Sequence, residues 1–381
     1  MAERREATHD VDVAIVGGGG NGILLACLLA DRGLTVRVLE RRDTIADRPR
    51  AFGIHPAALD ALDAVGVGDA VRAEALALTD GAFIGIDGRR AAVTFDPRDF
   101  PGPVVLGQNR VEELLEQRLH ALAPGALYRG VEVTAVTDEG SHVTLTATTG
   151  ADTFPVTATM VVLVDGTNGA LSERIAGPAR PVGPRRWYAM AEGDASPDDE
   201  PGSVALIASP QGVVESFPLP SGRRRWVAWR GTDAPLDADS FGMLVHDRTG
   251  RPVGRIHAPV SVFAAQSRRR RALVHGRVIL AGDAAMTVSP IGGQGLTIGW
   301  AAARVLADEL ASSQGDEPPR LRRYERAVDR MARRAQRRAS FFMRLGDPTS
   351  SRDRARALAV RVLALSSMRR AVYRIVVVRR P

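Results

Sequence analysis

The feature that most constrains the fold of this chain is a run of glycines behind a short apolar stretch. Residues 11–40 read VDVAIVGGGGNGILLACLLADRGLTVRVLE. The apolar residues 11–16 predict a buried strand, and the motif Gly17-x-Gly19-x-x-Gly22 follows it at once. The residues behind the motif predict a helix and then a second strand. We therefore expect a βαβ unit with the glycines at its first turn.

Glycines at such a turn let the backbone approach a ligand closely. The free N–H groups and the dipole of the following helix then favour a pyrophosphate. Glu40 ends the second strand 18 residues after Gly22, where a carboxylate can accept hydrogen bonds from an adenosine ribose. Arg41 follows it and joins the predicted site. Because an acid here disfavours a 2′-phosphate, the predicted ligand is FAD or NAD, and a purely structural glycine turn is the alternative.

The composition is typical of a globular chain with roughly two domains. Of the 381 residues, 45% are hydrophobic and 25% are charged. The chain has no lysine, and its net charge is +7. Residues 320–381 hold 19 arginines and 4 acidic residues, so the remainder of the chain is net negative. We therefore do not expect the main body to bind nucleic acid.

Several other classes of function find no support in the sequence. Cys27 is the only cysteine, which excludes an internal disulfide framework and a cysteine-based zinc site. The histidines show no metal-binding spacing, and no nucleophilic serine elbow occurs. The N-terminus has no apolar signal region. The expectation is a cytoplasmic enzyme without a metal.

A second glycine-rich turn lies about 260 residues after the first. Residues 277–310 read RVILAGDAAMTVSPIGGQGLTIGWAAARVLADEL. An apolar strand is expected to end at Gly282 and Asp283, and after a loop through Pro290 a helix is expected to begin near Gly295. A carboxylate beside a second helix N-terminus suggests one long ligand that is held at both ends.

These motifs resemble those of the FAD-dependent (class A) flavoprotein monooxygenases of the para-hydroxybenzoate hydroxylase family, and the resemblance runs through most of residues 10–310. In that family a GDAAH run precedes a PxGGQG-like loop. The resemblance implies that Asp283 binds the ribityl chain of FAD. It also implies that backbone N–H groups of Leu296 and Thr297 reach the flavin, where the helix dipole stabilises the reduced anion. The implied flavin-facing loop residues are Pro290, Gly292 and Gly293, without a side-chain acid or base, and Gly282 and Gly295 complete the implied FAD contacts.

Two further stretches resemble segments that bind the cofactor in this family. Residues 48–67 read RPRAFGIHPAALDALDAVGV, and Arg50 matches an arginine near the FAD pyrophosphate and flavin. A solvated arginine is the alternative. In residues 104–119, VVLGQNRVEELLEQRL, Gln108 matches a cofactor-binding glutamine and Arg110 is a further candidate. A simple helix cap is the alternative there.

A third stretch, residues 160–177, resembles the DG motif of the family. That motif is normally a DGxxSxVR pattern, which touches both FAD and the path of the nicotinamide cofactor. Asp165 and Gly166 fit the pattern, but Gly169 stands in place of the serine and Ser172 in place of the arginine. The match therefore supports FAD binding more than it supports NAD(P)H binding.

Three other residues have open interpretations. Arg174 lies two residues after Ser172 and is a candidate substitute for the missing arginine. Met286 replaces the histidine of GDAAH, and because methionine is an apolar filler that cannot transfer protons, we expect it to pack near the flavin. His55, before Pro56 at a helix start, is a candidate base.

Residues 178–276 change in character and predict an antiparallel sheet. Alternating runs such as SVALIAS, GVVESFPLP and RRRWVAWRG are separated by turn residues, and residues 70–100 are expected to add strands. In the family such a sheet covers the flavin and forms the substrate pocket. The candidate wall residues are Phe217, Leu219 and Trp226, with ordinary sheet core as the alternative. The basic runs at 223–225 and 268–271 are expected to be solvated, and attraction of an anionic substrate or of an NADPH phosphate is the alternative.

The tail of the chain predicts basic amphipathic helices. From Leu321 to Leu345 apolar residues recur every three or four positions between arginines. A second helix is expected after Ser350 or Ser351. Its apolar side would include Leu358, Val362, Leu365 and Val372. We expect the tail to pack against the FAD-binding domain, while docking on an anionic membrane and a dimer contact are the alternatives.

The predicted fold class is α/β, with a Rossmann-like FAD-binding domain, a second α+β substrate domain built on an antiparallel sheet, and C-terminal helices. The expected segments are 10–70, 101–177 and 277–320 for the FAD-binding domain, 71–100 and 178–276 for the substrate domain, and 321–381 for the basic tail.

The resemblance implies an FAD-dependent monooxygenase of secondary metabolism. NADPH or NADH would reduce FAD, and O2 would add to form a flavin C4a-hydroperoxide. One oxygen atom would then enter a small aromatic or polycyclic organic substrate by hydroxylation or epoxidation. The alternatives are a related FAD-dependent dehydrogenase or reductase without oxygen insertion and a flavin-binding accessory protein without turnover. The expected partners are the substrate and O2, with no nucleic acid, in a monomer or a homodimer.

Overall fold

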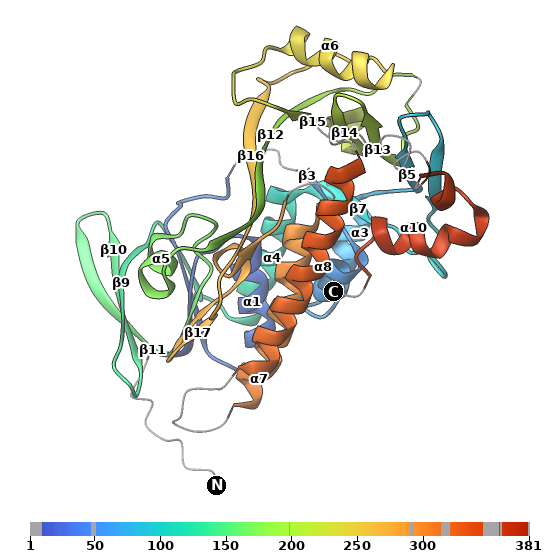
Figure 1. The fold of residues 1–381 in the computed structure, drawn as a ribbon. Coiled ribbons are helices and arrows are strands. Elements are labelled where there is room, and N and C mark those ends of the chain that lie inside the picture. Colours follow the sequence, from blue (N-terminus) through green and yellow to red (C-terminus); the bar gives the residue numbers. More distant parts are fainter. Residues whose placement is uncertain are drawn as a thin grey trace.

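The computed structural model describes most of the 381-residue chain. The described residues are 10–46, 51–197, 199–289, 293–313, 321–345, 358 and 360–379. The predictions made for Arg50, Pro290, Gly292, Ser350 and Ser351 therefore lie outside the described residues. The described part has the predicted α/β character, with three sheets and helices packed around them (Figure 1).

The first sheet is mostly parallel and confirms the βαβ unit predicted from the glycine motif. Its strands are β1 (Val11–Val16), β2 (Val36–Glu40), β8 (Leu127–Arg129), β9 (Glu132–Asp138), β10 (Val143–Thr149), β11 (Asp152–Leu163), β17 (Val274–His275) and β18 (Val278–Leu280). In the order β17-β18-β11-β1-β2-β8, the neighbours of β1 are parallel to it and β18 is parallel to β11. The strand ends that lead to Gly17, Glu40, Asp165 and Asp283 therefore share one edge of the sheet.

Helix α1 (Gly20–Ala30) is central to the core beside this sheet. Its residues from Ile23 to Leu29 are fully buried, and it packs against α4 (Gln108–Leu122) and α7 (Gln294–Ser312). The helix begins at Gly20 rather than at the predicted residue 23, because residues of the glycine motif themselves form its first turn. Helix α2 (Pro56–Asp63) also contacts α7, and α3 (Gly68–Glu74) follows α2.

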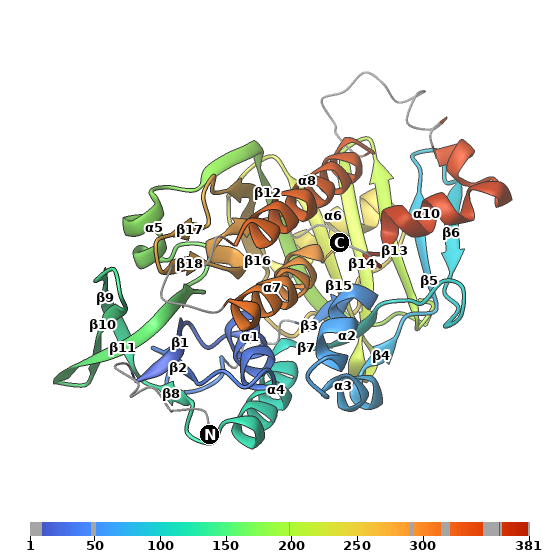
Figure 2. The same cartoon turned by 90° about the horizontal axis from the view of Figure 1, so that it is seen from below.

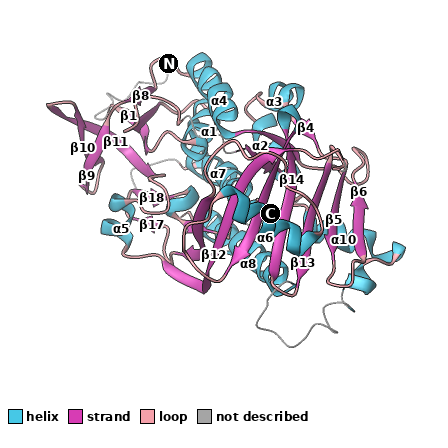
Figure 3. Cartoon of the chain, turned by 90° about the horizontal axis from the view of Figure 1, so that it is seen from above, coloured by secondary structure: helices cyan, strands magenta, loops and turns pink. Residues whose placement is uncertain are grey.

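The second sheet is mostly antiparallel, as predicted for the middle of the chain. Its strands are β5 (Asp80–Ile84), β6 (Arg90–Thr94), β12 (Arg180–Asp194), β13 (Ser203–Ser209), β14 (Gly212–Leu219), β15 (Arg223–Arg230), β16 (Ser261–Arg269) and β19 (Met286–Thr287). They follow the order β19-β16-β12-β15-β14-β13-β5-β6, so residues 70–100 do add strands to it. Helix α6 (Ala238–Thr249) covers one face of this sheet (Figure 3).

A small third sheet contains β3 (Ala51–Ile54), β7 (Val104–Gly107) and β4 (Leu76–Ala77). The strands of the two large sheets follow the predicted division into an FAD-binding and a substrate domain, apart from β17 and β19. The division itself stays a prediction.

Helix α8 (Arg322–Leu345) is the amphipathic helix predicted for the start of the tail, and it packs along α7 (Figure 2). Its residue Tyr324 is fully buried, and the Tyr324 hydroxyl donates a 2.7 Å hydrogen bond to the carbonyl of Leu280. At its other end, Phe342 packs in the core on the second sheet. The tail therefore contacts the helices of the first sheet, as predicted, and also the second sheet.

The apolar side predicted for the second tail helix is wrong. Leu358, Val362 and Leu365 are exposed by 60%, 44% and 57%, whereas Val372 is fully buried. The chain turns at Ser366–Met368 and continues as α10 (Arg369–Val376), which packs against β6 and β5. Residues on either side of this turn cannot share one helix face. Within the described residues, no helix is long and apolar enough to cross a membrane.

Candidate active site

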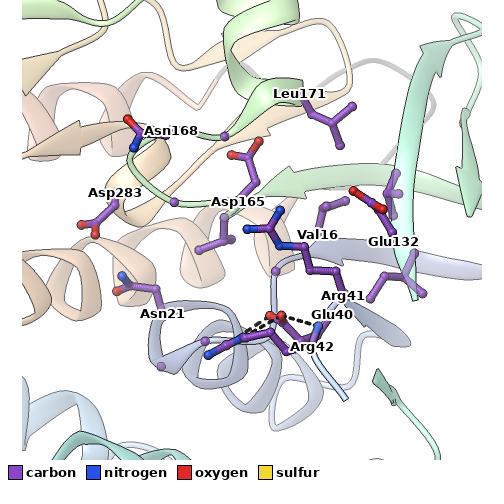
Figure 4. A pocket seen from close by; sticks show the side chains of 18 of the residues that line it. Val16, Asn21, Glu40, Arg41, Arg42, Glu132, Asp165, Asn168, Leu171 and Asp283 are labelled. Atoms are coloured by element: carbon purple, nitrogen blue, oxygen red, sulfur yellow. Dashed lines mark hydrogen bonds and ion pairs between the residues drawn. The ribbon is translucent and has the colours of Figure 1, made fainter. Parts of the chain in front are cut away.

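Two cavities meet beside Asp283. The first, of about 580 Å³, lies at the carboxyl edge of the first sheet and is lined largely by glycines and charged residues (Figure 4). The second, of about 1280 Å³, lies between that region and the second sheet. Gln108, Asp283 and Leu296 line both cavities. A long ligand could therefore extend from the first cavity into the second past these three residues.

The glycines of the first motif have different local roles. Gly17 has a φ of +112°, and a Cβ atom there would lie 2.4 Å from the carbonyl oxygen of Val164. A Cβ atom on Gly22 would lie 1.9 Å from the carbonyl oxygen of Gly17. Both positions therefore require glycine for close packing of the turn. Gly17 and Gly19 line the first cavity, and the nearest atoms around a Cβ on Gly19 are side-chain tips at 3.7 Å or more.

Glu40 lines the first cavity and is held by two neighbours. The Gly18 N–H donates to Oε2 at 2.6 Å, and the Nε atom of Arg42 donates to Oε1 at 2.8 Å. Burial alone would raise the pKa of Glu40, but the hydrogen bonds from Arg42 and Gly18 outweigh it and leave that pKa below its usual value. Arg41 lines the same cavity, as predicted, and so does Arg42, which the sequence analysis did not identify (Figure 4).

Glu112 is a further residue of this cavity that the sequence analysis missed. Its Oε1 atom accepts hydrogen bonds from the Gly20 N–H at 3.1 Å and from the Gln108 side chain at 2.9 Å. Its spacing of four residues from Gln108 on a predicted helix was the available signal. Arg110 does not line either cavity, because it pairs with Glu74 and with Glu113 on its own helix.

The two departures in the DG motif are structurally connected. The carboxylate of Asp165 accepts hydrogen bonds from the Ser172 N–H at 3.0 Å and from the Ser172 hydroxyl. A Cβ atom on Gly169 would lie 2.0 Å from Cγ of Asp165. Glycine at 169 thus makes room for the carboxylate, and serine at 172 binds it at the start of α5 (Ala170–Ala176). Asp165 and Gly166 still line the first cavity.

Arg174, the candidate substitute for the missing arginine of the DG motif, lies away from both cavities. Its guanidinium donates a 3.1 Å hydrogen bond to the carbonyl of Thr134. The side chain therefore lies against β9 and lines neither cavity.

Asp283 lies in a short 3-10 turn, Gly282–Ala284, directly after β18. Its side chain is exposed to the cavities, but protein surrounds it at longer range, and this burial raises its pKa. Within the described residues its carboxylate has no hydrogen-bond or ion-pair partner. Gly293, with a φ of +61°, precedes the first residue of α7 nearby. A carboxylate and a free helix N-terminus thus lie on the path between the two cavities.

Three buried polar side chains around this point also have no hydrogen-bond partner in the described part of the chain. They are Asn21, with its Oδ1 atom, Gln294, with both amide atoms, and Thr297, with its hydroxyl. Buried polar atoms are costly to leave unpaired. Asn21 lines the first cavity, where a polar ligand can reach it, whereas Gln294 and Thr297 line neither cavity and are covered by protein.

Of the three predicted wall residues, Phe217 lines the second cavity. Trp226 is wrong as a wall residue, because the side chains of β15 alternate and Trp226 packs with Phe241 of α6 on the other face. Leu219 is also wrong, because it does not line the cavity and is buried behind Leu78 and Val105, which do line it. The apolar side chains that do line the cavity include Phe83, Met190, Phe217, Val227, Phe263 and Phe342.

The prediction that the arginine runs are solvated is wrong for several members. Arg224 is only 1% exposed and donates a 2.8 Å hydrogen bond to the Ser216 hydroxyl. Arg225 is buried, faces the second cavity and pairs with Glu192. Arg270 is buried and donates a 2.9 Å hydrogen bond to the carbonyl of Ala284. These guanidinium groups are therefore buried and hydrogen-bonded within the protein rather than solvated.

Met286 is buried in the core around α1, as expected for a packing residue, but it lines neither cavity, so its position near the flavin stays a prediction. His55 precedes α2, is buried and lines the second cavity, where its Nδ1 atom accepts a 3.3 Å hydrogen bond from the Val378 N–H. Among the described residues, no group of three or more His, Cys, Asp or Glu side chains could hold a metal ion.

The fold and the paired cavities define a dinucleotide-binding α/β flavoprotein with a second, sheet-based domain. The chain belongs to the FAD-binding domain family, whose model matches residues 10–339. FAD is therefore its cofactor.

Individual relatives agree with this assignment. The chain is 32% identical over 317 residues to 6-methylpretetramide 4-monooxygenase of Streptomyces rimosus, covering 78% of this chain and 55% of the relative. It is 31% identical over 328 residues to 12-dehydrotetracycline 5-monooxygenase/anhydrotetracycline 6-monooxygenase of the same species, covering 81% and 64%. The chain thus spans 55% of the length of the first relative and 64% of the length of the second.

A solved structure shows the same fold. The crystal structure of p-nitrophenol 4-monooxygenase from Pseudomonas putida superposes with a TM-score of 0.80 at 22% sequence identity. The match covers 97% of this chain and 99% of that chain.

Proposed function

We propose that this chain is an FAD-dependent monooxygenase that inserts one oxygen atom from O2 into an aromatic or polycyclic substrate. NADPH or NADH would supply two electrons, and the second oxygen atom would leave as water. The single observation that carries the proposal is the connection of a polar, glycine-lined cavity to a large cavity with an aromatic lining. The activities named for the tetracycline-pathway relatives point in the same direction.

The residues present fit FAD. Glu40, charged and oriented by Arg42, is placed to bind the adenosine ribose. Gly19 leaves space for a pyrophosphate beside the N-terminus of α1, with Arg41 nearby. Asp283 lacks any other partner among the described residues and is placed to accept hydrogen bonds from the ribityl chain. The other proposed FAD contacts are Gly17, Gln108, Asp165, Gly166 and Gly282, with Gly22 shaping the turn.

The first turn of α7 is the proposed binding site for the flavin end. Its N–H groups at Gly295, Leu296 and Thr297 lie where a helix dipole favours negative charge. Gly293 is part of this region, and we propose that it faces the ring. Bound FAD supplies the electron transfer and the activation of O2.

The second cavity would position the substrate and exclude water. Phe83, Phe217 and Phe263 offer flat apolar surfaces against which an aromatic ring can stack. The half-buried Glu192 and its buried partner Arg225 give the cavity a polar group for orientation of the substrate. Positioning of this kind is the main contribution that a protein makes when a cofactor carries the chemistry.

An isotope experiment tests the proposed function. The FAD-loaded protein is mixed with NADPH or NADH, 18O2 and one of a panel of hydroxylated naphthalenes, anthracenes and anhydrotetracycline. We expect nicotinamide oxidation that depends on the aromatic compound and one 18O atom in the product. Oxidation of the nicotinamide without 18O in any compound would overturn the proposal in favour of an oxidoreductase without oxygen insertion.

The partners and the location follow from the same proposal. We infer that the enzyme acts in the cytoplasm, where NAD(P)H is available, and that the tail packs on the protein body rather than on a membrane. The burial of Tyr324, Val328 and Phe342 supports this, because the apolar side of α8 is already covered. Sedimentation with anionic vesicles should leave the protein in solution. Light scattering would distinguish a monomer from a homodimer.

A further inference from the structure

We propose that the described residues of the C-terminal segment, 340–345 and 360–379, form the far wall of the substrate cavity through Phe342 and Val376 and set the length of the aromatic substrate. This inference rests on the proposed function, because it concerns the substrate of that same site. The segment lies outside residues 10–339, which the family model matches. It nevertheless contributes two residues, Phe342 and Val376, to the cavity lining.

The second cavity has a near end and a far end with respect to Asp283. Its lining includes residues of seven neighbouring strands, from Thr287 of β19, four residues after Asp283, to Phe83 of β5. Six strand spacings correspond to about 29 Å. Asp283 lies at the β19 end, because β19 begins three residues after it. A substrate that reacts there and extends across the sheet therefore approaches β5.

Phe342, near the end of α8, closes part of this far end. It is buried, and its ring centroid lies 5.3 Å from that of Phe83, with the rings tilted by 34°. Phe341 contacts the same ring from the side, at 6.1 Å and 88°. Helix α8 thus covers the ring of Phe83, which projects from β5. Phe342 presents a fixed apolar surface to the cavity.

Val376, the last residue of α10, lines the rest of the far end of the cavity. A Cβ atom on Gly81 of β5 would lie 2.9 Å from Cγ1 of Val376, so the glycine permits the close approach of α10 to this strand. Two hydrogen bonds fix the chain just beyond. The Val378 N–H donates to Nδ1 of His55 at 3.3 Å, and the Ala57 N–H donates to the carbonyl of Val378 at 3.1 Å.

The middle of α10 is fixed to the protein as well. The Tyr373 hydroxyl donates a 3.0 Å hydrogen bond to the carbonyl of Pro101, and the Phe100 and Tyr373 rings pack edge to face at 5.1 Å. The far wall is therefore apolar and attached at several points. It should favour an apolar ring at the distal end of the substrate and exclude substrates that extend beyond it.

A binding experiment tests this wall without any turnover. The FAD-loaded protein is titrated without oxygen or NAD(P)H with 2-naphthol, 2-anthrol and anhydrotetracycline, and binding is followed by the absorbance of the flavin. The quantity compared is the affinity for a long ligand, 2-anthrol or anhydrotetracycline, divided by the affinity for the short ligand, 2-naphthol. Val376→Ala and Phe342→Ala should each raise this ratio about tenfold, and Val376→Phe should lower it, because pocket space of this size changes discrimination by about that factor.

Val362→Ala is the matched control, because it removes the same atoms from an exposed site in the same segment. It should leave the ratio unchanged. The ratio is measured on one sample, so a partial loss of folded protein does not alter it. Unchanged ratios in all three cavity variants, or no response of the wild type to any of the ligands, would overturn the proposal. If the ratios change while no 18O enters any compound, the wall stands and the monooxygenase proposal fails.

Discussion

At the scale of single residues, the DG motif shows how two unusual residues can explain one another. Asp165 is turned toward the start of α5, where Ser172 binds it and Gly169 leaves room for it. Neither residue alone has an obvious purpose in the sequence. Their combination keeps the carboxylate in the cavity lining while fixing its direction.

Gly169→Ala tests this connection. The new Cβ atom would lie 2.0 Å from Cγ of Asp165, so the carboxylate must move and its hydrogen bonds to Ser172 must break. We expect a loss of about 1–3 kcal/mol in the free energy of unfolding, measured by thermal or urea denaturation. The FAD dissociation constant should rise in the same variant.

The matched control is Gly242→Ala in α6, where a Cβ atom would meet nothing within 4 Å. This change should stabilise the protein by about 0.5–1 kcal/mol, because alanine is the better helix former. Equal stability of Gly169→Ala and the wild type would show that the two departures are not connected.

Asp283→Asn should weaken FAD binding and stabilise the FAD-free protein. Hydrogen bonds to a carboxylate contribute about 1.5–3 kcal/mol, so the FAD dissociation constant should rise at least about tenfold. Burial raises the pKa of Asp283 in the folded protein above its ordinary value of 3.8. The carboxyl therefore stabilises the fold below that ordinary value, and the contribution is lost as the pH rises through the raised pKa.

The FAD-free Asp283→Asn protein should consequently gain stability over the wild type as the pH rises above the ordinary aspartate pKa of 3.8. Melting temperatures of both proteins at increasing pH provide the measurement. Asp233→Asn, at an exposed position, is the control for the loss of one carboxylate charge. A wild type that is the more stable of the two at pH 8 without FAD would contradict the expectation.

At the scale of elements, α8 supports the strand that leads to Asp283. The Tyr324 hydroxyl reaches from α8 to the carbonyl of Leu280, three residues before Asp283. The predicted amphipathic pattern placed apolar residues toward the protein, but the hydroxyl bond depends on where α8 lies relative to β18.

Tyr324→Phe should cost about 1–2 kcal/mol in the free energy of unfolding, because it removes a buried hydrogen bond and leaves the rest of the packing in place. Chemical denaturation measures this. Tyr128→Phe, at a residue that is 41% exposed, is the control and should change the stability by less than about 0.5 kcal/mol. Identical free energies of unfolding for both variants would show that the hydrogen bond of the Tyr324 hydroxyl does not stabilise the fold.

At the scale of the whole molecule, the FAD site joins parts of the chain that are far apart in the sequence. Gly19, Glu40, Asp165 and Asp283 meet because four parallel strands end at one edge of a sheet. A ligand that touches all of them should stabilise the whole fold.

FAD at about 100 times its dissociation constant should raise the free energy of unfolding by about 2.7 kcal/mol. A thermal scan with increasing FAD should show a melting temperature that rises continuously with concentration. Riboflavin, which lacks the pyrophosphate and adenosine, should give a smaller rise at equal concentration. A melting temperature that does not respond to FAD would contradict the proposed site.

Local patterns were sufficient for the βαβ unit, the second glycine turn, the antiparallel sheet and α8. Each of these depends on residues that are close in sequence, through hydrophobic period, glycine backbone freedom or helix start signals. The two glycine-rich turns indicated Gly17, Glu40 and Asp283, and the family resemblance added Gln108 and Asp165. All five line the first cavity.

Tertiary structure decided the rest, because those features depend on which distant segments pair. Strand pairing determined that Phe217 faces the cavity while Trp226 faces α6. Packing between helices brought Glu112 to the N-terminus of α1. The turn before α10 exposed Leu358 and placed Val376 at the far end of the substrate cavity. No local period carries that information, since it arises only when α10 lies against β5 and β6.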